Sequence, residues 1–234
     1  MKTIGMIGGM SWESSIEYYR IINETVRARL GGLHSARSVM VSVDFAEIET
    51  LQHQGKWDEA TALMIEAARH VERGGADFVL ICTNTMHRMA DQVQAHIQIP
   101  LLHIADATAE RIKGQGLHKI GLLGTRFTME EDFYRGRLVH AHGLEVLIPG
   151  TEQRETVHRI IYDELCRGKI RPTSRKQYVG IMDYLVERGA EGIILGCTEI
   201  GLLVGEADSR VPLFDTTRIH AEAAVARALG AERA

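Results

Sequence analysis

Short apolar runs alternate with stretches of helical periodicity along the whole chain, and most of the runs end at glycine, asparagine or threonine. Such alternation of strand and helix is typical of parallel sheets that are covered by helices on both faces. The apolar runs predict strands at residues 4–7, 39–43, 78–81, 101–104, 120–123, 144–147, 192–195 and 211–214.

The helical stretches carry apolar side chains on one face and end at glycines. The first has Ile16, Tyr19, Ile22, Val26 and Leu30 on its predicted buried face, and a second carries Leu63, Met64, Ala67 and Val71. A third helix is expected to open with a capping box at Ser174 and Gln177, to bury Tyr178, Ile181 and Leu185, and to end at Gly189.

The two halves of the chain nearly repeat each other. Residues 76–85 align with 190–199 without a gap, so that Thr83 falls on Cys197 at an offset of 114 (197 minus 83). Two further segments, which begin at residues 3 and 99, align with segments that begin at 119 and 211, at offsets of 116 (119 minus 3) and 112 (211 minus 99).

Three segments in the same order and at similar offsets predict two pseudo-symmetric α/β halves, residues 1–104 plus 216–234 and residues 105–215. We expect the active site in a cleft between them, with Thr83 on one wall and Cys197 on the other. This arrangement suits a reaction that needs one proton-transfer group on each face of a substrate.

Composition narrows the class of protein. The 234 residues are 45% hydrophobic and 25% charged, with a net charge of −4 and no basic run or aromatic ladder that would indicate nucleic-acid binding. We expect neither a signal peptide nor a membrane segment. Three cysteines form no disulfide framework, so we expect free thiols in a reducing cytoplasm.

Ligands of parallel sheets bind at the carboxyl ends of the strands. This rule selects the loop 8–11, residues 83–85, Thr125 and residues 197–199. Neither a dinucleotide fingerprint, which would need a third spaced glycine, nor a P-loop lysine is present.

Cys197 is the strongest candidate for chemistry. It follows a predicted strand at the start of a predicted helix, and a helix N-terminus lowers the pKa of a thiol. Cys82 should face the helix layer if Thr83 faces the site, because successive strand residues alternate, and Cys166 is expected to pack in a helix. His87 could donate a hydrogen bond into the site, or it could form hydrogen bonds with nearby backbone groups. No metal motif is present, and no lysine stands out for pyridoxal phosphate.

The strand-end motifs resemble the aspartate/glutamate racemase family over essentially the whole chain. They are Gly8-Gly9-Met10-Ser11, Thr83-Asn84-Thr85-Met86-His87, Gly196-Cys197-Thr198-Glu199 and Asp215-Thr216-Thr217-Arg218-Ile219-His220. The resemblance implies a cofactor-independent homodimer of two α/β halves, with an amino-acid substrate between two cysteines. One thiolate removes the Cα proton, and the opposite thiol protonates the other face.

This chain has Thr83 in place of the first cysteine, as in the branch of the family specific for L-aspartate and L-glutamate. The resemblance therefore implies conversion of the L to the D isomer, with Cys197 as base and reprotonation from the Thr83 side. Cys166 stands where aspartate-selective members carry a lysine, and Arg167 or Lys169 could substitute for that lysine. Without such a substitute, the resemblance implies a pocket for uncharged substrates such as homoserine.

The resemblance also assigns binding roles. Asn84, Thr85 and Thr198 would hold the α-carboxylate, and Glu199 would receive the α-ammonium or orient Cys197. The remaining lining residues are Met10, Ser11, Gln52 and Thr125. For Ser11, Asn84, Thr85 and Thr198, helix capping is the alternative role, and both roles can hold together.

Two rival functions use the same cleft. A decarboxylase or isomerase would need only the Cys197 thiol, and a non-enzymatic amino-acid sensor would bind a ligand without exchanging its Cα proton. Exchange of that proton with deuterium separates these possibilities from racemisation.

Overall fold

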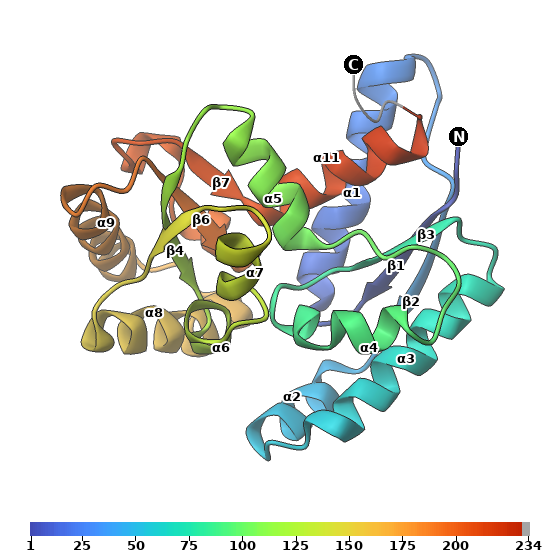
Figure 1. Cartoon of the computed structure of the whole chain (residues 1–234), viewed down its shortest axis with the longest axis horizontal. Helices are drawn as coiled ribbons and strands as arrows, with labels where there is room; N and C mark the ends of the chain where they lie inside the picture. Colours follow the sequence, from blue (N-terminus) through green and yellow to red (C-terminus); the bar gives the residue numbers. More distant parts are fainter. Residues whose placement is uncertain (231–234) are drawn as a thin grey trace. The chain divides into compact units, whose positions relative to one another are not determined.

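A computed structural model describes residues 1–230 of the chain, which folds into two units (Figure 1). Among the described residues, unit 1 comprises 1–104 and 220–230, and unit 2 comprises Ala105–Ile219. Our sequence-based division placed residues 216–219 with the first half, whereas the structure groups them with unit 2. Residues 231–234, which that division also covered, lie outside the described residues.

Unit 1 is built on a parallel sheet whose central strand is β1 (Ile4–Gly8), with β2 (Ser38–Ser42) on one side and β3 (Phe78–Ile81) on the other. Beyond β3, Leu101 forms a single parallel bridge with Val79. The strand expected at residues 101–104 is therefore wrong in extent, because α5 already begins at Ile104.

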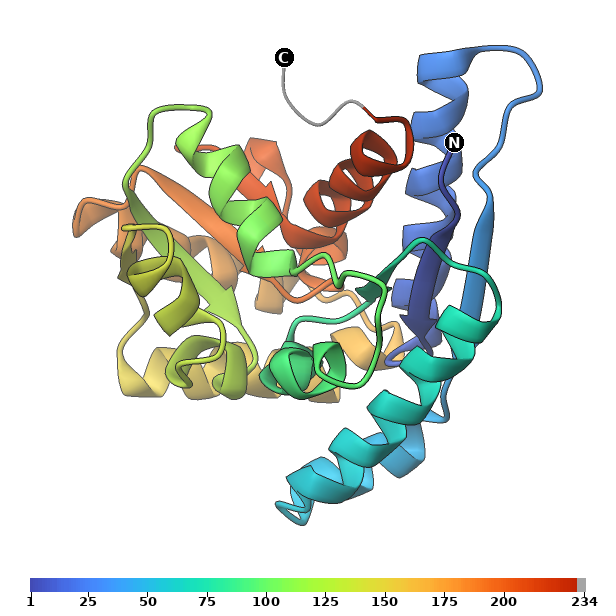
Figure 2. The ribbon, with the colours of Figure 1, turned by 45° about the vertical axis from the view of Figure 1, so that its right-hand side comes forward.

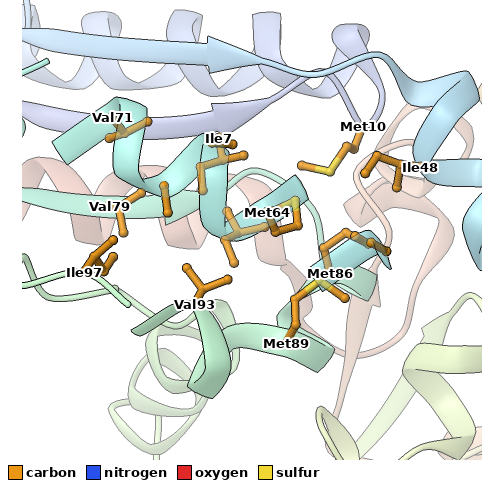
Figure 3. Close-up of a cluster of buried hydrophobic side chains, with 14 of the residues drawn as sticks. Ile7, Met10, Ile48, Met64, Val71, Val79, Met86, Met89, Val93 and Ile97 are labelled. Carbon is orange, nitrogen blue, oxygen red and sulfur yellow. The ribbon is translucent and has the colours of Figure 1, made fainter. Parts of the chain in front are cut away.

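Helices cover both faces of this sheet. One face packs against α1 (Trp12–Leu30) and α11 (Thr216–Ala228), and the other against α2 (Phe45–His53), α3 (Trp57–Arg73) and α4 (Ala90–Gln94). The second face holds the apolar cluster of Figure 3, and α3 runs alongside the strands (Figure 2).

Side chains of β3 alternate between the two faces. Phe78 and Leu80 pack with α1 and α11, whereas Val79 and Ile81 belong to the opposite cluster. Cys82 continues the first set and is fully buried there, so its expected packing role is confirmed. Burial alone raises the pKa of its thiol far above the ordinary value.

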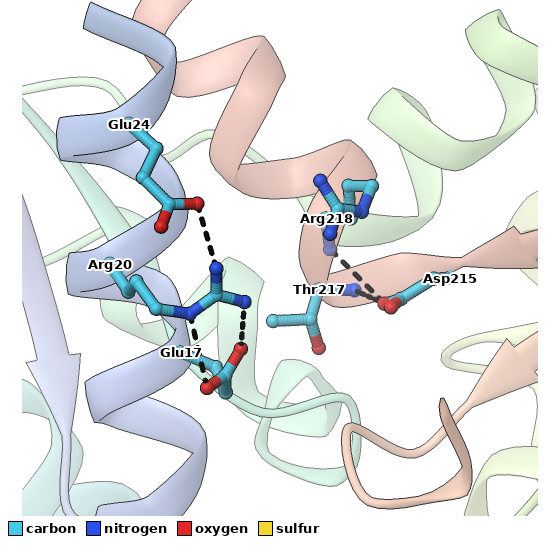
Figure 4. Close-up of polar contacts among 6 residues, drawn as sticks. All are labelled: Glu17, Arg20, Glu24, Asp215, Thr217 and Arg218. Carbon is cyan, nitrogen blue, oxygen red and sulfur yellow. Dashed lines mark hydrogen bonds and ion pairs between the residues drawn. The ribbon is translucent and has the colours of Figure 1, made fainter. Parts of the chain in front are cut away.

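The buried face of α1 agrees with our expectation only in part. Ile22 and Val26 are buried as expected, but Ile16 and Tyr19 are 52% and 54% exposed. Tyr18 and Ile21 are buried against the sheet in their place. The helix has apolar residues on both sides, so periodicity alone could not select the inner one. Arg20 also lies outside, where it pairs with Glu17 and Glu24 (Figure 4).

Unit 2 repeats the topology of unit 1. Its strands are β4 (Lys119–Gly124), β5 (Glu145–Leu147), β6 (Gly192–Gly196) and β7 (Leu213–Asp215). Their order β5-β4-β6-β7, all parallel, matches the order β2-β1-β3 followed by the Leu101 bridge. The predicted α/β fold class and the pseudo-symmetry of the halves are thus confirmed at the level of topology.

The helical elements that lie mainly in unit 2 are α5 (Ile104–Lys113), α6 (Arg126–Glu130), α7 (Arg135–His140), α8 (Thr151–Asp163), η2 (Leu165–Arg167), α9 (Pro172–Glu187), α10 (Ile200–Leu203) and η3 (Glu206–Asp208). At the start of α11, Asp215 accepts hydrogen bonds from the backbone N–H groups of Thr217 and Arg218 (Figure 4).

Within residues 1–230, no helix is long and apolar enough to cross a membrane.

The capping box expected at Ser174 is wrong. The helix α9 begins two residues earlier, at Pro172. Proline suits the first helical position because a backbone N–H there has no partner within the helix, so its absence removes no hydrogen bond. Ser174 is buried and donates its hydroxyl to Glu164 at 2.6 Å instead.

The orientation of α1 can be tested by two truncations on the same helix. Ile22→Ala should lower the free energy of unfolding by about 2–5 kcal/mol, because it removes a fully buried side chain. Ile16→Ala, the matched control, should change it by less than about 0.5 kcal/mol. Urea denaturation followed by circular dichroism measures both. A larger loss for Ile16→Ala would mean that the exposed side had been assigned wrongly.

Candidate functional site

The unit 1 residues expected in the site gather at the ends of β1 and β3. Ile7 pairs with Ile81, and the Cys82 N–H donates to the Ile7 carbonyl at 2.9 Å. The Ser14 hydroxyl donates to the Cys82 carbonyl at 2.9 Å, which ties the start of α1 to the end of β3. The loop after β1 therefore lies beside Thr83.

The loop after β1 is a tight turn. Gly9 has a φ of +93°, and a Cβ there would collide with the Val43 backbone, so only glycine fits. The Ser15 hydroxyl accepts the Gly9 N–H at 2.7 Å. Ser11 caps α1 by accepting the Ser14 N–H at 3.4 Å, which confirms the capping role that was the alternative for this residue.

Met10 and Gln52 are both buried near Met86. Met10 is 5% exposed and belongs to the apolar cluster with Ile48 and Met86 (Figure 3). The Gln52 side chain donates to the Met86 sulfur at 2.9 Å. The two predicted lining residues, Met10 and Gln52, thus lie beside Met86, at the edge of the apolar cluster of unit 1.

Thr83 is partly exposed, whereas Asn84 and Thr85 are buried at the start of η1 (Thr85–Met89). His87, on the same turn, bonds Thr83 O through Nδ1 at 2.8 Å, and its Nε2 accepts the Ile104 N–H at 3.2 Å. Of the two roles considered for His87, the structure therefore shows the one that satisfies backbone groups.

In unit 2, two glycines bring the ends of β4 and β6 together. Gly124 pairs with Gly196, and a Cβ on Gly196 would lie 2.8 Å from the Leu123 carbonyl and 3.2 Å from a Thr128 methyl. Thr125 and Cys197, the next residues along each strand, are therefore neighbours.

Thr125 also caps α6. Its hydroxyl accepts the Thr128 N–H at 3.3 Å, and the residue is 6% exposed.

Cys197 donates its thiol hydrogen to Glu199. The Sγ–Oε2 distance is 2.9 Å, and the Thr198 hydroxyl donates to the same carboxylate oxygen at 2.6 Å. Cys197 and Thr198 are partly buried, and Glu199 is 6% exposed. The three consecutive residues form one hydrogen-bonded group after β6.

The expected lowering of the Cys197 pKa is wrong. Burial raises the pKa of its thiol well above the ordinary value, and the Glu199 carboxylate and the Cys166 thiol raise it further. The following helix, α10, has only four residues, so its dipole offers little to a thiolate. In the free protein Cys197 is therefore a protonated thiol beside a carboxylate that accepts its hydrogen.

Sequence reasoning missed the groups that surround Cys197. Tyr178, which we expected only on the buried face of a helix, is fully buried and donates its hydroxyl to the Val157 carbonyl at 3.2 Å. Burial raises its pKa, and so do the negative charges that Cys197, Cys166, Glu164 and Glu199 carry when ionised, so these four groups lie near it.

Cys166 also differs from expectation. It lies in η2, after the end of α8, and η2 packs against α10. No sequence spacing signalled that it would lie near Cys197. Within residues 1–230, no group of three or more His, Cys, Asp or Glu side chains could hold a metal ion.

Comparison with known proteins places this fold and these motifs among racemases. The family model of Asp/Glu/hydantoin racemase matches residues 7–224. A crystal structure of a candidate Asp/Glu racemase from Yersinia pestis is 57% identical, with a TM-score of 0.93 and coverage of 98% of this chain and 100% of that chain. An aspartate racemase homologue from Pyrococcus horikoshii OT3 is 36% identical, with a TM-score of 0.86 and the same coverage.

A third relative is the broad specificity amino-acid racemase RacX of Bacillus subtilis (strain 168). It is 25% identical over 171 residues, which are 72% of this chain and 72% of that protein.

The raised pKa of Cys197 predicts slow alkylation. An ordinary thiol has a pKa of about 8.5, so at pH 8 Cys197 should be thiolate to a smaller extent and react more slowly with iodoacetamide. Glu199→Gln removes the carboxylate charge and should lower the pKa, accelerating alkylation about tenfold.

Peptide mass spectrometry resolves Cys197 from the other two cysteines. The control is Glu187→Gln, which removes a carboxylate from the exposed end of α9. An equal rate of Cys197 alkylation in Glu199→Gln and in the unmodified protein would show that the Glu199 charge does not raise the pKa of Cys197.

Proposed function

Because the chain belongs to the Asp/Glu/hydantoin racemase family, and is thus an isomerase, we propose that it racemises L-aspartate and L-glutamate by Cα proton transfer without a cofactor. The observation that carries this proposal is the Cys197–Glu199 hydrogen bond at the end of β6, with Thr83 at the equivalent end of β3. The two residues would act on opposite faces of the substrate Cα.

The first step begins with the thiol of Cys197. Its hydrogen already points at the Glu199 carboxylate, so transfer to that carboxylate leaves a thiolate. Arrival of the substrate α-ammonium adds a positive charge that offsets the acidic surroundings and favours this transfer. The thiolate then removes the Cα proton of the L isomer, and the electron pair of the broken C–H bond stays on the substrate as a carbanion.

The second step differs from a symmetrical two-cysteine mechanism. The carbanion takes a proton on its other face from the Thr83 hydroxyl or from a water that this hydroxyl orients, which yields the D isomer. The alkoxide or hydroxide left behind regains a proton from solvent, and the protonated Glu199 releases one to solvent, which restores the starting state. A hydroxyl is a far weaker acid than a thiol, so this step limits the reaction. The equilibrium constant of a racemisation is unity, so kcat/KM must be equal for the two isomers, while kcat and KM can each differ.

The remaining candidates would bind the substrate. Asn84, Thr85 and Thr198 would hold the α-carboxylate through side-chain and backbone donors, while Ser11 and Thr125 line the loops beside them. Because η1 and α10 are short, we assign this binding to hydrogen-bond donors rather than to helix dipoles. Met10 and Gln52 would close the side-chain end.

A second candidate is a racemase of uncharged amino acids such as homoserine. The carboxylates of Glu164 and Glu199, together with Cys166 and Cys197, lie near Tyr178, and this acidic surrounding would disfavour a second carboxylate on the substrate. The similarity to a broad specificity amino-acid racemase points the same way. We also propose a homodimer, as the family resemblance implies, which sedimentation equilibrium would test.

Proton NMR in D₂O tests the reaction. L-aspartate, L-glutamate and L-homoserine, each incubated with metal-free and cofactor-free protein, should lose the Cα proton signal as the D isomer forms. Cys197→Ser should abolish the loss, and the order of rates would rank the substrates.

Absence of exchange with every substrate would refute the racemase assignment for these amino acids. Decarboxylation of a malonate by the same protein would favour the single-cysteine alternative. Tight amino-acid binding without exchange would favour a sensor.

Substituting Thr83 by the missing cysteine tests the second step. Thr83→Cys should raise kcat/KM by at least about tenfold, because a thiol is a much stronger general acid. The increase should be equal in both directions, since the equilibrium constant does not change. Chiral chromatography of reactions started from each isomer measures it, with Thr83→Ser as the control that keeps the hydroxyl. A fall in activity for Thr83→Cys together with normal activity for Thr83→Ala would exclude Thr83 from proton transfer.

A further inference from the structure

Both ring nitrogens of His87 bind the backbone of unit 1. Nδ1 lies 2.8 Å from the carbonyl oxygen of Thr83, and Nε2 lies 3.2 Å from the backbone nitrogen of Ile104. The ring is 2% exposed. His87 is thus a buried link between the turn after β3 and the start of α5.

These partners determine the protonation of the ring. A carbonyl oxygen only accepts, so Nδ1 must carry a hydrogen, and a backbone N–H only donates, so Nε2 must offer a lone pair. His87 is therefore the neutral Nδ1–H tautomer. Protonation of Nε2 would remove the acceptor of the Ile104 N–H.

A second buried imidazole holds the same connecting segment. The Tyr18 hydroxyl lies 2.8 Å from Nδ1 of His220, whose Nε2 lies 2.8 Å from the carbonyl oxygen of Leu102. By the same reasoning Nε2 of His220 carries the hydrogen, and Tyr18 donates to Nδ1. The His87 ring lies 5.8 Å from that of His220 and 4.5 Å from that of His103. The segment 102–104 is thus bound on its carbonyl side by His220 and on its N–H side by His87.

From this geometry we propose that His87 is a positioning residue for Thr83. Its Nδ1–H binds the Thr83 carbonyl and its Nε2 binds the Ile104 N–H, so the ring ties the backbone of Thr83 to the start of α5. A fixed backbone limits the χ1 rotamers open to a β-branched side chain, which narrows the directions that the Thr83 hydroxyl can take. The inference rests on the proposed role of Thr83 in reprotonation.

A positioning role predicts a change in how the carbanion partitions. In D₂O the carbanion either takes a deuteron on the Thr83 side, which gives the D isomer, or is protonated again by Cys197. Once the Cys197 thiol has exchanged its hydrogen with the solvent, this second path gives deuterated L isomer. The ratio of inversion to retention therefore reports the Thr83 side alone. A mere loss of folded protein would lower both products together and leave the ratio unchanged.

Three substitutions separate the two bonds of His87. The amide nitrogen of Asn can occupy the place of Nδ1, whereas the amide of Gln reaches the place of Nε2 and leaves the Thr83 carbonyl without its donor. His87→Gln and His87→Leu should lower the ratio of inversion to retention about tenfold, as expected for a misplaced reacting group. His87→Asn should keep the ratio close to that of the unmodified protein.

The matched control is His220→Asn, which removes a buried imidazole from the same cluster without touching the bond to Thr83. It should lower stability and leave the ratio unchanged. An unchanged ratio in His87→Gln and His87→Leu, or an equal fall in His220→Asn, would overturn the proposal. If instead Cys197→Ser still exchanged the Cα proton, the proposed function itself would fail.

A measurement on the unmodified protein tests the proposal without activity. Nitrogen-15 NMR distinguishes the protonated from the bare ring nitrogen, and His87 should show a hydrogen on Nδ1 with a scalar coupling across the hydrogen bond to the Thr83 carbonyl. An Nε2–H tautomer would overturn the proposal, even if the His87 variants do not fold.

Discussion

The parallel pairing of β1 with β3 and of β4 with β6 is the constraint on which each half of the candidate site depends. Parallel strands end at the same edge of a sheet, so residues far apart in sequence emerge side by side. In unit 1 this pairing sets the turn at Gly9 beside Thr83, and in unit 2 it sets Thr125 beside Cys197. The absence of a side chain on Gly196 permits the approach in unit 2.

The chemistry available to unit 2 follows from one hydrogen bond in an enclosed acidic setting. A thiol next to a buried carboxylate holds its proton more tightly than a thiol in water. This makes it a poor base at rest but gives it a well-defined resting state. The proton has a neighbouring acceptor, and the positive charge needed to stabilise a thiolate can arrive with an amino-acid substrate. Proton removal would thereby be coupled to binding of the correct ligand.

Unit 1 uses neutral imidazoles where charged groups would be costly to bury. Each nitrogen of His87 and His220 has a partner of the matching kind, so the rings satisfy backbone groups at the turn after β3 and at the segment 102–104 without carrying charge. The result is a set of polar contacts behind Thr83, between the apolar clusters that cover the two faces of the sheet.

The amino-acid sequence by itself determined the repeated α/β order and the equivalence of Thr83 and Cys197, because the two halves align residue by residue. It also determined the inward position of Cys82, because successive side chains of a strand alternate between its two faces. It could not select the buried face of α1, because Ile16 and Ile22 are both apolar and only packing distinguishes them. It also could not show that Tyr178 and Cys166 lie near Cys197. The tertiary structure decided these points, because the electrostatic setting of a thiol depends on which distant side chains the fold brings close and how completely it excludes water.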